Sequence, residues 1–179
     1  MILFADTNIL IDAQKVDVYK DFLQAEDEVF MESSMLVDEV KSPSGYANEL
    51  ISCGLKIFDM TDDEFVLATE MHENDKKLSF YDCVAYAVSK SRNWILVTGD
   101  NRLRKTAERD GITVHGFIWV LQQCDIEDDE RMMSILKAII DDSAVRLPKN
   151  KLLDAFPHLK DRLVWVDCSG FLWYNISIR

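Results

Sequence analysis

Short apolar runs alternate along this chain with longer segments of helical periodicity. Each apolar run has the length of a buried strand rather than of a helix. Between the runs, apolar residues recur at the spacing of amphipathic helices. Strands that alternate with helices in this way predict βαβ units, and therefore an α/β fold whose parallel sheet is covered on both faces. The expected strands are Ile2–Ala5, Val29–Met31, Leu55–Phe58, Trp94–Thr98 and Ile112–His115.

Polar residues and glycines mark the expected helix ends. After the first strand an Asx-containing turn leads into a helix predicted to run to about Leu23. Pro43 suits the first turn of a later helix, and Gly54 suits its C-terminus. Thr61, with a glutamate three residues later, forms a capping box, and Ser79 is the expected cap of the next helix.

The end of the chain follows a different pattern. Helices are expected over Phe117–Cys124 and Glu127–Asp141, and β-rich runs follow at Leu163–Val166 and Phe171–Ile178. Apolar and polar residues alternate in the last run, which is typical of a half-buried strand. We therefore predict a domain over residues 1–124 and, packed on it, a C-terminal extension over residues 125–179 with a helical segment and a β-hairpin.

Composition restricts the class of protein. With 179 residues, of which 48% are hydrophobic and 29% charged, the chain suits one globular domain with a small appendage. No apolar run approaches the roughly 18–20 residues that span a bilayer, and the first residues lack the features of a signal peptide. The four cysteines show no zinc-binding spacing, so we expect a reducing, cytoplasmic location and no membrane association.

The net charge of −12 disfavours nonspecific binding to nucleic acid, because phosphate contacts require Lys and Arg. Any nucleic-acid contact must therefore be local. Basic residues gather directly after Asp100, at Arg102, Arg104, Lys105 and Arg109.

Four acids lie at the ends of expected strands or in the first turns of expected helices: Asp6, Glu39, Asp82 and Asp100. Open parallel sheets bind ligands outside the carboxyl ends of their strands, so such positions converge. Carboxylates that converge repel one another unless a divalent cation lies among them. The pattern therefore predicts a metal-dependent enzyme that acts on phosphate.

Each of these residues also has a structural alternative. Asp6 and Asp100 could cap the helices that follow them, and Asn8 could belong to an Asx turn. Glu39 has three nearby acids as competitors for its role, namely Asp38, Glu32 and Glu49. By contrast, Asp82 lies in an otherwise apolar helix start, where an unpaired carboxylate is costly.

The motifs together resemble those of a PIN domain. Asp6-Thr7-Asn8 follows the first strand, Glu39 stands alone, Asp82 opens an Ala-rich helix, and Thr98-Gly99-Asp100 follows another strand. The resemblance spans about Met1–Leu121 and is strongest to the VapC-type toxins of toxin–antitoxin systems. It implies a three-layer α/β/α sandwich with a central, mostly parallel five-stranded sheet.

The resemblance also implies an activity, namely hydrolysis of RNA by a Mg²⁺- or Mn²⁺-dependent endoribonuclease. Asp6, Asp82 and Asp100 would then be the metal ligands, and Glu39 would complete the catalytic set by binding or orienting the water. Asn8 and Thr98 would support the site. The RNA contacts are expected at Arg102, Arg104 and Lys105.

Toxins of this type are held by a cognate antitoxin and dimerise, so both partners are expectations here. Two other functions remain open: a PIN-fold scaffold that binds RNA or protein without cleavage, and a structure-specific DNA nuclease. A receiver domain would need a lysine after the fifth strand, where Gly116 stands, and a haloacid-dehalogenase-type phosphatase would need two aspartates where Asp6-Thr7-Asn8 stands.

Overall fold

The computed structural model describes residues 1–26, 28–141, 145 and 147–159. The chain divides into two compact units, the first of which is Met1–Asp125, while the second begins at Ile126. The β-hairpin predicted between residues 163 and 178 lies outside the described residues.

The first unit contains a sheet that, in the described part of the chain, has five strands in the order β3-β2-β1-β4-β5. All of its neighbouring strands pair in parallel. This confirms the predicted fold class. The bounds of β1 are those predicted from the sequence, and the ends of the other strands differ from the prediction by at most two residues. The strands are β1 (Ile2–Ala5), β2 (Glu28–Glu32), β3 (Lys56–Phe58), β4 (Ile95–Val97) and β5 (Val114–His115).

The central strand β1 is buried because both of its faces are covered. Leu3 pairs with Val29 of β2 on one side and with Ile95 of β4 on the other. Leu3 and Phe4 are fully buried. A parallel strand in this position must be apolar on both faces, which explains the continuous apolar run at the start of the chain.

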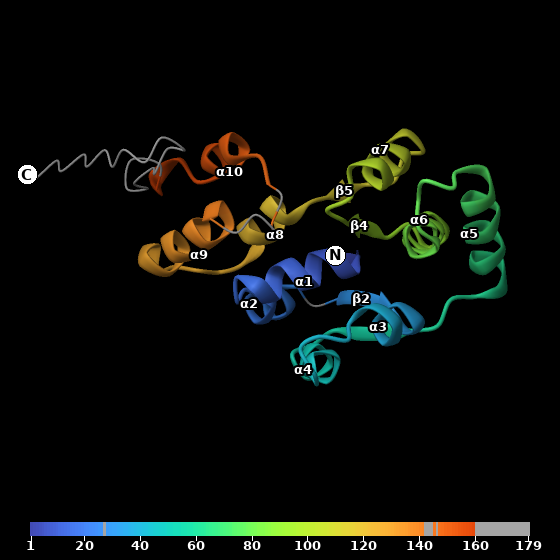
Figure 1. The fold of residues 1–179 in the computed structure, drawn as a ribbon, viewed down its shortest axis with the longest axis horizontal. Helices are drawn as coiled ribbons and strands as arrows, with labels where there is room; N and C mark the ends of the chain where they lie inside the picture. The colour runs from blue at the N-terminus through green and yellow to red at the C-terminus, as the bar shows by residue number, and fades with distance from the viewer. Residues whose placement is uncertain (27, 142–144, 146, 160–179) are drawn as a thin grey trace, which may run out of the picture. The chain divides into compact units, whose positions relative to one another are not determined.

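Helices fill the segments between the strands. In Figure 1, α1, α2 and α8 lie on one side of the strands, and α5 and α6 lie on the other. Helix α6 contacts both β1 and β4, so the sheet is the middle layer of an α/β/α sandwich. The helices of this unit are α1 (Thr7–Lys15), α2 (Tyr19–Ala25), α3 (Ser33–Glu39), α4 (Tyr46–Ser52), α5 (Asp62–Asn74), α6 (Phe80–Arg92), α7 (Asn101–Arg109) and α8 (Phe117–Gln123).

Two sequence predictions about helix ends are wrong. The single helix expected to reach Leu23 is broken into α1 and α2, because Asp17 adopts a left-handed backbone with φ 54°. Pro43 lies before α4 rather than in its first turn, because Gly45, with φ 86°, is the N-cap of that helix. The capping boxes at Thr61 and Ser79 are confirmed.

The described part of the second unit is helical. It contains α9 (Asp129–Asp141), α10 (Lys149–Ala155) and a 3₁₀ turn at Pro157–Leu159. Within this unit, His158 Nε2 lies 3.8 Å from Asp129 Oδ1. Over the described ranges, no helix of either unit combines the length and apolar character needed to cross a membrane.

Candidate active site at the carboxyl edge of the sheet

Asp6 and Asp100 meet at one edge of the sheet because β1 and β4 are adjacent parallel strands. The Asp6 amide donates to the Val97 carbonyl at 3.0 Å, which continues the strand pairing to the end of β1. The fully buried Thr98 joins the two acids. Its hydroxyl donates to Asp6 Oδ2 at 2.8 Å and accepts from the Asp100 amide at 3.0 Å.

The surroundings of Asp6 oppose the ionisation of its carboxyl group. Its side chain is buried, and burial raises its pKa to about 7, to which the negative charges of Asp82 and Glu39 add. The hydrogen bond from Thr98 opposes this rise. An acid whose ionised form is penalised by both desolvation and neighbouring acids gains most from a nearby cation. Asp82 and Glu39 thus lie near enough to Asp6 for their charges to oppose its ionisation.

Glu39 lies at the last position of α3 and is exposed. Thr7 holds its carboxylate in place, because the Thr7 hydroxyl donates to Glu39 Oε2 at 2.6 Å. Sequence reasoning did not assign a role to Thr7. The available signal was its place in the sequence, since Thr7 stands between Asp6 and Asn8 in the same motif.

Asp82 and Asp100 both bond to the backbone of helix N-termini. Asp82 Oδ2 accepts from the Ser79 amide at 2.7 Å in the capping box of α6. Asp100 Oδ1 accepts from the amides of Arg102 and Leu103 at 2.8 and 2.6 Å, and so caps α7. The capping alternative thus holds for Asp100, whereas the Asp6 side chain forms no cap at α1. These bonds fix the two carboxylates without using both oxygens of either one.

The donor set suits a hard divalent cation. Glu39, Asp82 and Asp100 each have one oxygen without a hydrogen bond in the described part of the chain, and Mg²⁺ or Mn²⁺ prefers carboxylate oxygens and water. Among the described residues, however, no three His, Cys, Asp or Glu side chains are grouped as a set that could hold a metal ion. The residues fit such a cation in their chemistry, whereas their side chains in the described part of the chain are not gathered around one point.

Asn8 and Arg104 have different surroundings from the acids. Asn8 is exposed on the first turn of α1 and has no hydrogen bond within the described residues. Arg104 reaches back toward the sheet, where its Nη2 donates to the Thr98 carbonyl at 3.1 Å. Gly116 leaves room for this guanidinium, since a Cβ there would lie 2.3 Å from Arg104 Nη2. Arg104 thus supports the backbone of the residue that joins Asp6 to Asp100.

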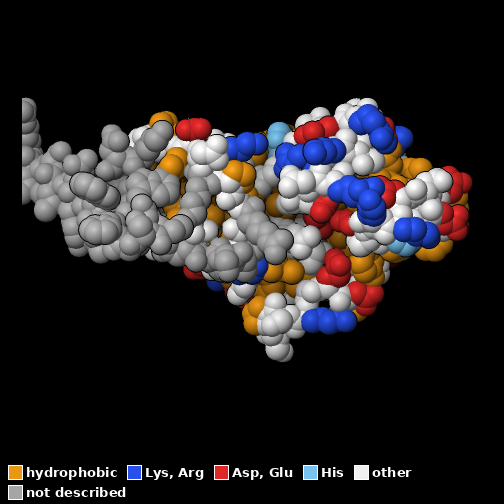
Figure 2. Space-filling model, turned by 45° about the horizontal axis from the view of Figure 1, so that its top comes forward, with side chains coloured by type: hydrophobic (Ala, Val, Ile, Leu, Met, Phe, Trp, Pro, Cys, Tyr) orange, Lys and Arg blue, Asp and Glu red, His pale blue; other side chains and the backbone are white. Residues whose placement is uncertain are grey.

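The other two bases predicted to contact RNA lie on the outer face of α7. Arg102 makes a bidentate ion pair with Asp75, with Nη2–Oδ2 at 2.7 Å. Lys105 is exposed and has no ion pair in the described part of the chain. Figure 2 shows Lys and Arg side chains interspersed with Asp and Glu on the side of the molecule where α5, α6 and α7 lie. The surface here is of mixed charge.

Comparison with known proteins gives a family. The family model described as "PIN domain" matches residues 3–109, which include all four acids and Thr98. The crystal structure of PAE2754 from Pyrobaculum aerophilum is similar at 16% sequence identity and a TM-score of 0.49, over 69% of this chain and 95% of that one. None of the curated proteins searched matches this chain. Because the match of the family model covers more than half of the sequence, the chain belongs to the PIN-domain family.

Proposed function

We propose that this protein is a Mg²⁺- or Mn²⁺-dependent endoribonuclease. The observation that carries the proposal is the buried Asp6, whose pKa is raised by burial and by the charges of Asp82 and Glu39. These acids lie at the carboxyl edge of a parallel sheet, where α/β folds bind their ligands. PIN domains are in general nucleases, and this acid cluster is the part of the chain suited to that chemistry.

The roles of the residues follow from their environments. Asp6 and Asp82 would hold a divalent cation, with Asp100 at the neighbouring strand end. Such a cation, when bound, supplies charge stabilisation on the phosphate and lowers the pKa of water. Glu39, held through Oε2 by Thr7, accepts the proton of the attacking water at its other oxygen. The water oxygen forms a bond to phosphorus as one ribose–phosphate bond breaks, and the leaving oxygen takes a proton from solvent.

We further propose that the protein is a VapC-type toxin of a toxin–antitoxin pair. The order and spacing of Asp6-Thr7-Asn8, Glu39, Asp82 and Thr98-Gly99-Asp100 support this assignment. The assignment implies that the protein binds a cognate antitoxin, forms a homodimer and is located in the cytoplasm. Copurification of this chain with the product of an adjacent small gene, with loss of nuclease activity in the complex, is the expected result.

The enzyme assay compares the purified protein with Asp6→Asn. Both are incubated with tRNA, rRNA and single-stranded DNA in Mg²⁺, Mn²⁺ or EDTA. We expect RNA fragments only from the parent protein with a metal, because the asparagine side chain cannot supply an anionic ligand. Asp12→Asn is the matched control, since Asp12 has the same charge but pairs with Lys15 at 3.0 Å on α1.

Other outcomes of this assay have definite meanings. Full activity of Asp6→Asn contradicts the mechanism. Cleavage of DNA but not RNA identifies a DNA nuclease, and RNA binding without cleavage by the parent protein in either metal identifies a scaffold.

A further inference from the structure

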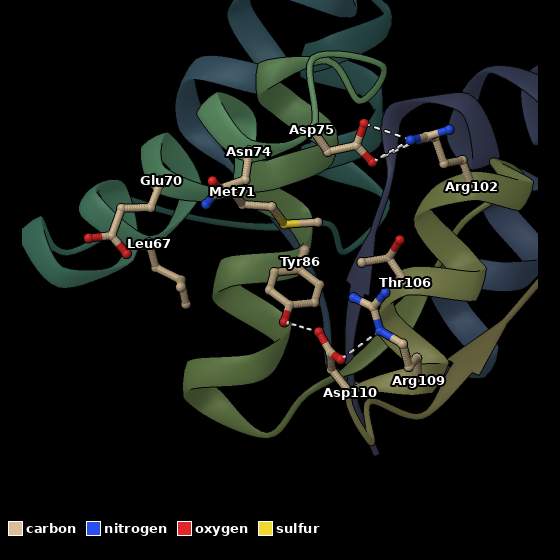
Figure 3. Close-up of a pocket in the computed structure, with 10 residues that line it drawn as sticks. All are labelled: Leu67, Glu70, Met71, Asn74, Asp75, Tyr86, Arg102, Thr106, Arg109 and Asp110. Atoms are coloured by element: carbon tan, nitrogen blue, oxygen red, sulfur yellow. Dashed lines mark hydrogen bonds and ion pairs between the residues drawn. The ribbon is translucent and has the colours of Figure 1, made fainter.

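A hollow of about 480 Å³ lies between α5, α6 and α7, outside the acid cluster. A second hollow of about 450 Å³ adjoins it, because Asp75, Arg102, Thr106 and Arg109 line both. Figure 3 shows the first hollow, with side chains of α5 on one side and those of α7 on the other. Together the hollows form a continuous depression along α7, which we call the α7 depression.

Helical spacing builds the two walls. Leu67, Met71 and Asn74 follow one face of α5 at intervals of four and three residues. Thr106 and Arg109 do the same on α7. Residues three or four apart share a helix face, so each wall is continuous. The walls differ in chemistry, since α5 supplies two apolar side chains, Leu67 and Met71, beside the polar Glu70 and Asn74, whereas α7 supplies cationic and hydroxyl groups.

The cationic wall has unused donors. Arg102 directs Nε and Nη2 to Asp75, which leaves Nη1 without a hydrogen bond among the described residues. Arg109 directs Nε to Asp110, which leaves both of its Nη atoms. Lys105 lines the second hollow and is exposed. The acidic partners fix the two guanidinium groups in place while their remaining N–H donors stay available to an anion.

The first hollow combines an apolar floor with polar edges. Leu67 and Met71 are half-buried, and Tyr86 of α6, its ring almost fully buried, is fixed by the hydrogen bond of its hydroxyl to Asp110 at 2.6 Å. At the rim, the Asn74 amide and the Thr106 hydroxyl have no hydrogen-bond partner in the described residues. A nucleobase requires this combination of an apolar surface for its ring and donors and acceptors for its edge.

The α7 depression starts next to the candidate active site. Asp100 caps α7 through the amide of Arg102, whose side chain lines both hollows. Asp75 lies just after α5, and Ser79 opens the helix that carries Asp82. An RNA strand bound with its scissile phosphate at the four acids would therefore reach the α7 depression within a few nucleotides.

We propose that the α7 depression is a subsite for single-stranded RNA, in which one unstacked base enters the first hollow and flanking phosphates bind Arg102, Lys105 and Arg109. This inference rests on the proposed ribonuclease function. It assigns the phosphate contacts to Lys105, Arg109 and the free edge of Arg102, and it assigns none to Arg104. Duplex RNA is excluded, because its paired bases cannot leave the stack to enter a hollow of this kind.

The test measures binding without cleavage. Asp6→Asn is the parent, and the probe is a fluorescein-labelled single-stranded RNA of mixed sequence, followed by fluorescence anisotropy in EDTA across a range of salt. In this background, Lys105→Ala with Arg109→Ala should weaken binding and reduce the salt slope by about 0.7 for each phosphate that the protein no longer neutralises. Lys20→Ala with Lys56→Ala is the matched control, since it removes the same charge from other elements, where each lysine pairs with a surface glutamate.

The base hollow is tested separately. Thr106→Trp should fill the first hollow and weaken the binding of single-stranded RNA about tenfold, because the indole displaces the base. The salt slope should change little, because the phosphate-binding side chains stay in place. If circular dichroism shows that Thr106→Trp is misfolded, Asn74→Ala replaces it, because Asn74 is exposed. We expect this variant to bind single-stranded RNA severalfold more weakly. A hairpin duplex of the same composition should be insensitive to either change.

The proposal is overturned if both sets of variants match the control, if the duplex responds as strongly as the single strand, or if the parent binds no RNA. Cleavage by the protein with native Asp6 is measured in parallel. A response in binding without any cleavage would refute the ribonuclease function and leave the subsite standing. If the native protein cleaves RNA and the depression variants change neither cleavage nor binding, the subsite is refuted and the ribonuclease function stands.

Discussion

At the scale of single residues, Asp6 couples stability to chemistry. A carboxylate that is buried beside two other acids is costly to ionise, and the structure retains it at the end of β1. Thr98 offsets part of this cost through its hydrogen bond to Asp6. The same repulsion favours a bound cation, because a positive charge among the acids replaces repulsion with attraction.

Asp6 should make the metal-free protein less stable as pH rises. Its pKa is about 7 in the folded state and near 3.8 in an unfolded chain, so between these values the folded state binds more protons than the unfolded state. The free energy of unfolding therefore falls from about pH 4 to about pH 7 and levels off above. At pH 8 the cost is on the order of 4 kcal/mol, at 1.36 kcal/mol for each unit of the rise in pKa.

Urea unfolding in EDTA measures this effect. Asp6→Asn has no charge to lose, so it should be more stable than the native protein at pH 8 and should lack this part of the pH dependence. Addition of Mg²⁺ should stabilise the native protein more than the variant, since binding to the folded state alone raises stability. Identical pH profiles for the two proteins in EDTA would contradict the assigned pKa.

At the scale of elements, the faces of α7 have distinct functions. Arg104 faces the sheet and donates to the Thr98 carbonyl, while Lys105 faces outward. Arg104→Ala should therefore lower the free energy of unfolding by about 1 kcal/mol, the value typical of one intramolecular hydrogen bond. Lys105→Ala should leave stability almost unchanged.

The two variants should behave in the opposite way toward RNA. In the Asp6→Asn background, Lys105→Ala should reduce the salt slope of RNA binding. Arg104→Ala should not, because its guanidinium faces the sheet and does not line the α7 depression. Chemical denaturation and anisotropy titration check the pair. A reduced salt slope in Arg104→Ala would return this residue to the RNA surface on which the sequence placed it.

Some elements are predictable from a single chain and others are not. The strands were predictable because a buried parallel strand needs a continuous apolar run, as at Ile2–Ala5. The break between α1 and α2 was not, because Val16 and Val18 continue the apolar pattern across Asp17. The order of the strands also depends on pairings such as Leu3 with Ile95, which no local pattern encodes.

The site shows the same division. The acids could be predicted because a polar residue that directly follows an apolar strand is conspicuous, as Asp6 and Asp100 are. The ion pairing of the basic residues could not be predicted. Arg102 meets Asp75, 27 residues away, only once α5 and α7 have packed near one another. Its pairing turns the expected basic patch into a surface of mixed charge.

At the scale of the whole molecule, the first unit holds all that the proposed chemistry requires. Met1–Asp125 includes the five described strands, the four acids and both walls of the α7 depression. The matched family region, residues 3–109, lies entirely within it. A unit with its own sheet and its own buried residues, Leu3, Phe4 and Leu96 among them, is expected to fold as a domain.

A chain that ends at Asp125 should therefore fold cooperatively and keep metal-dependent cleavage of RNA. Urea unfolding followed by circular dichroism tests the first expectation, and the RNA assay in Mg²⁺ and EDTA tests the second. The matching Asp6→Asn variant of the short chain shows whether any cleavage comes from the same site. Since the second unit adds none of the four acids, its removal should act on association or partner binding, which sedimentation of the two chains compares directly. A short chain that unfolds without a transition would show instead that the sheet depends on residues beyond Asp125 for its stability.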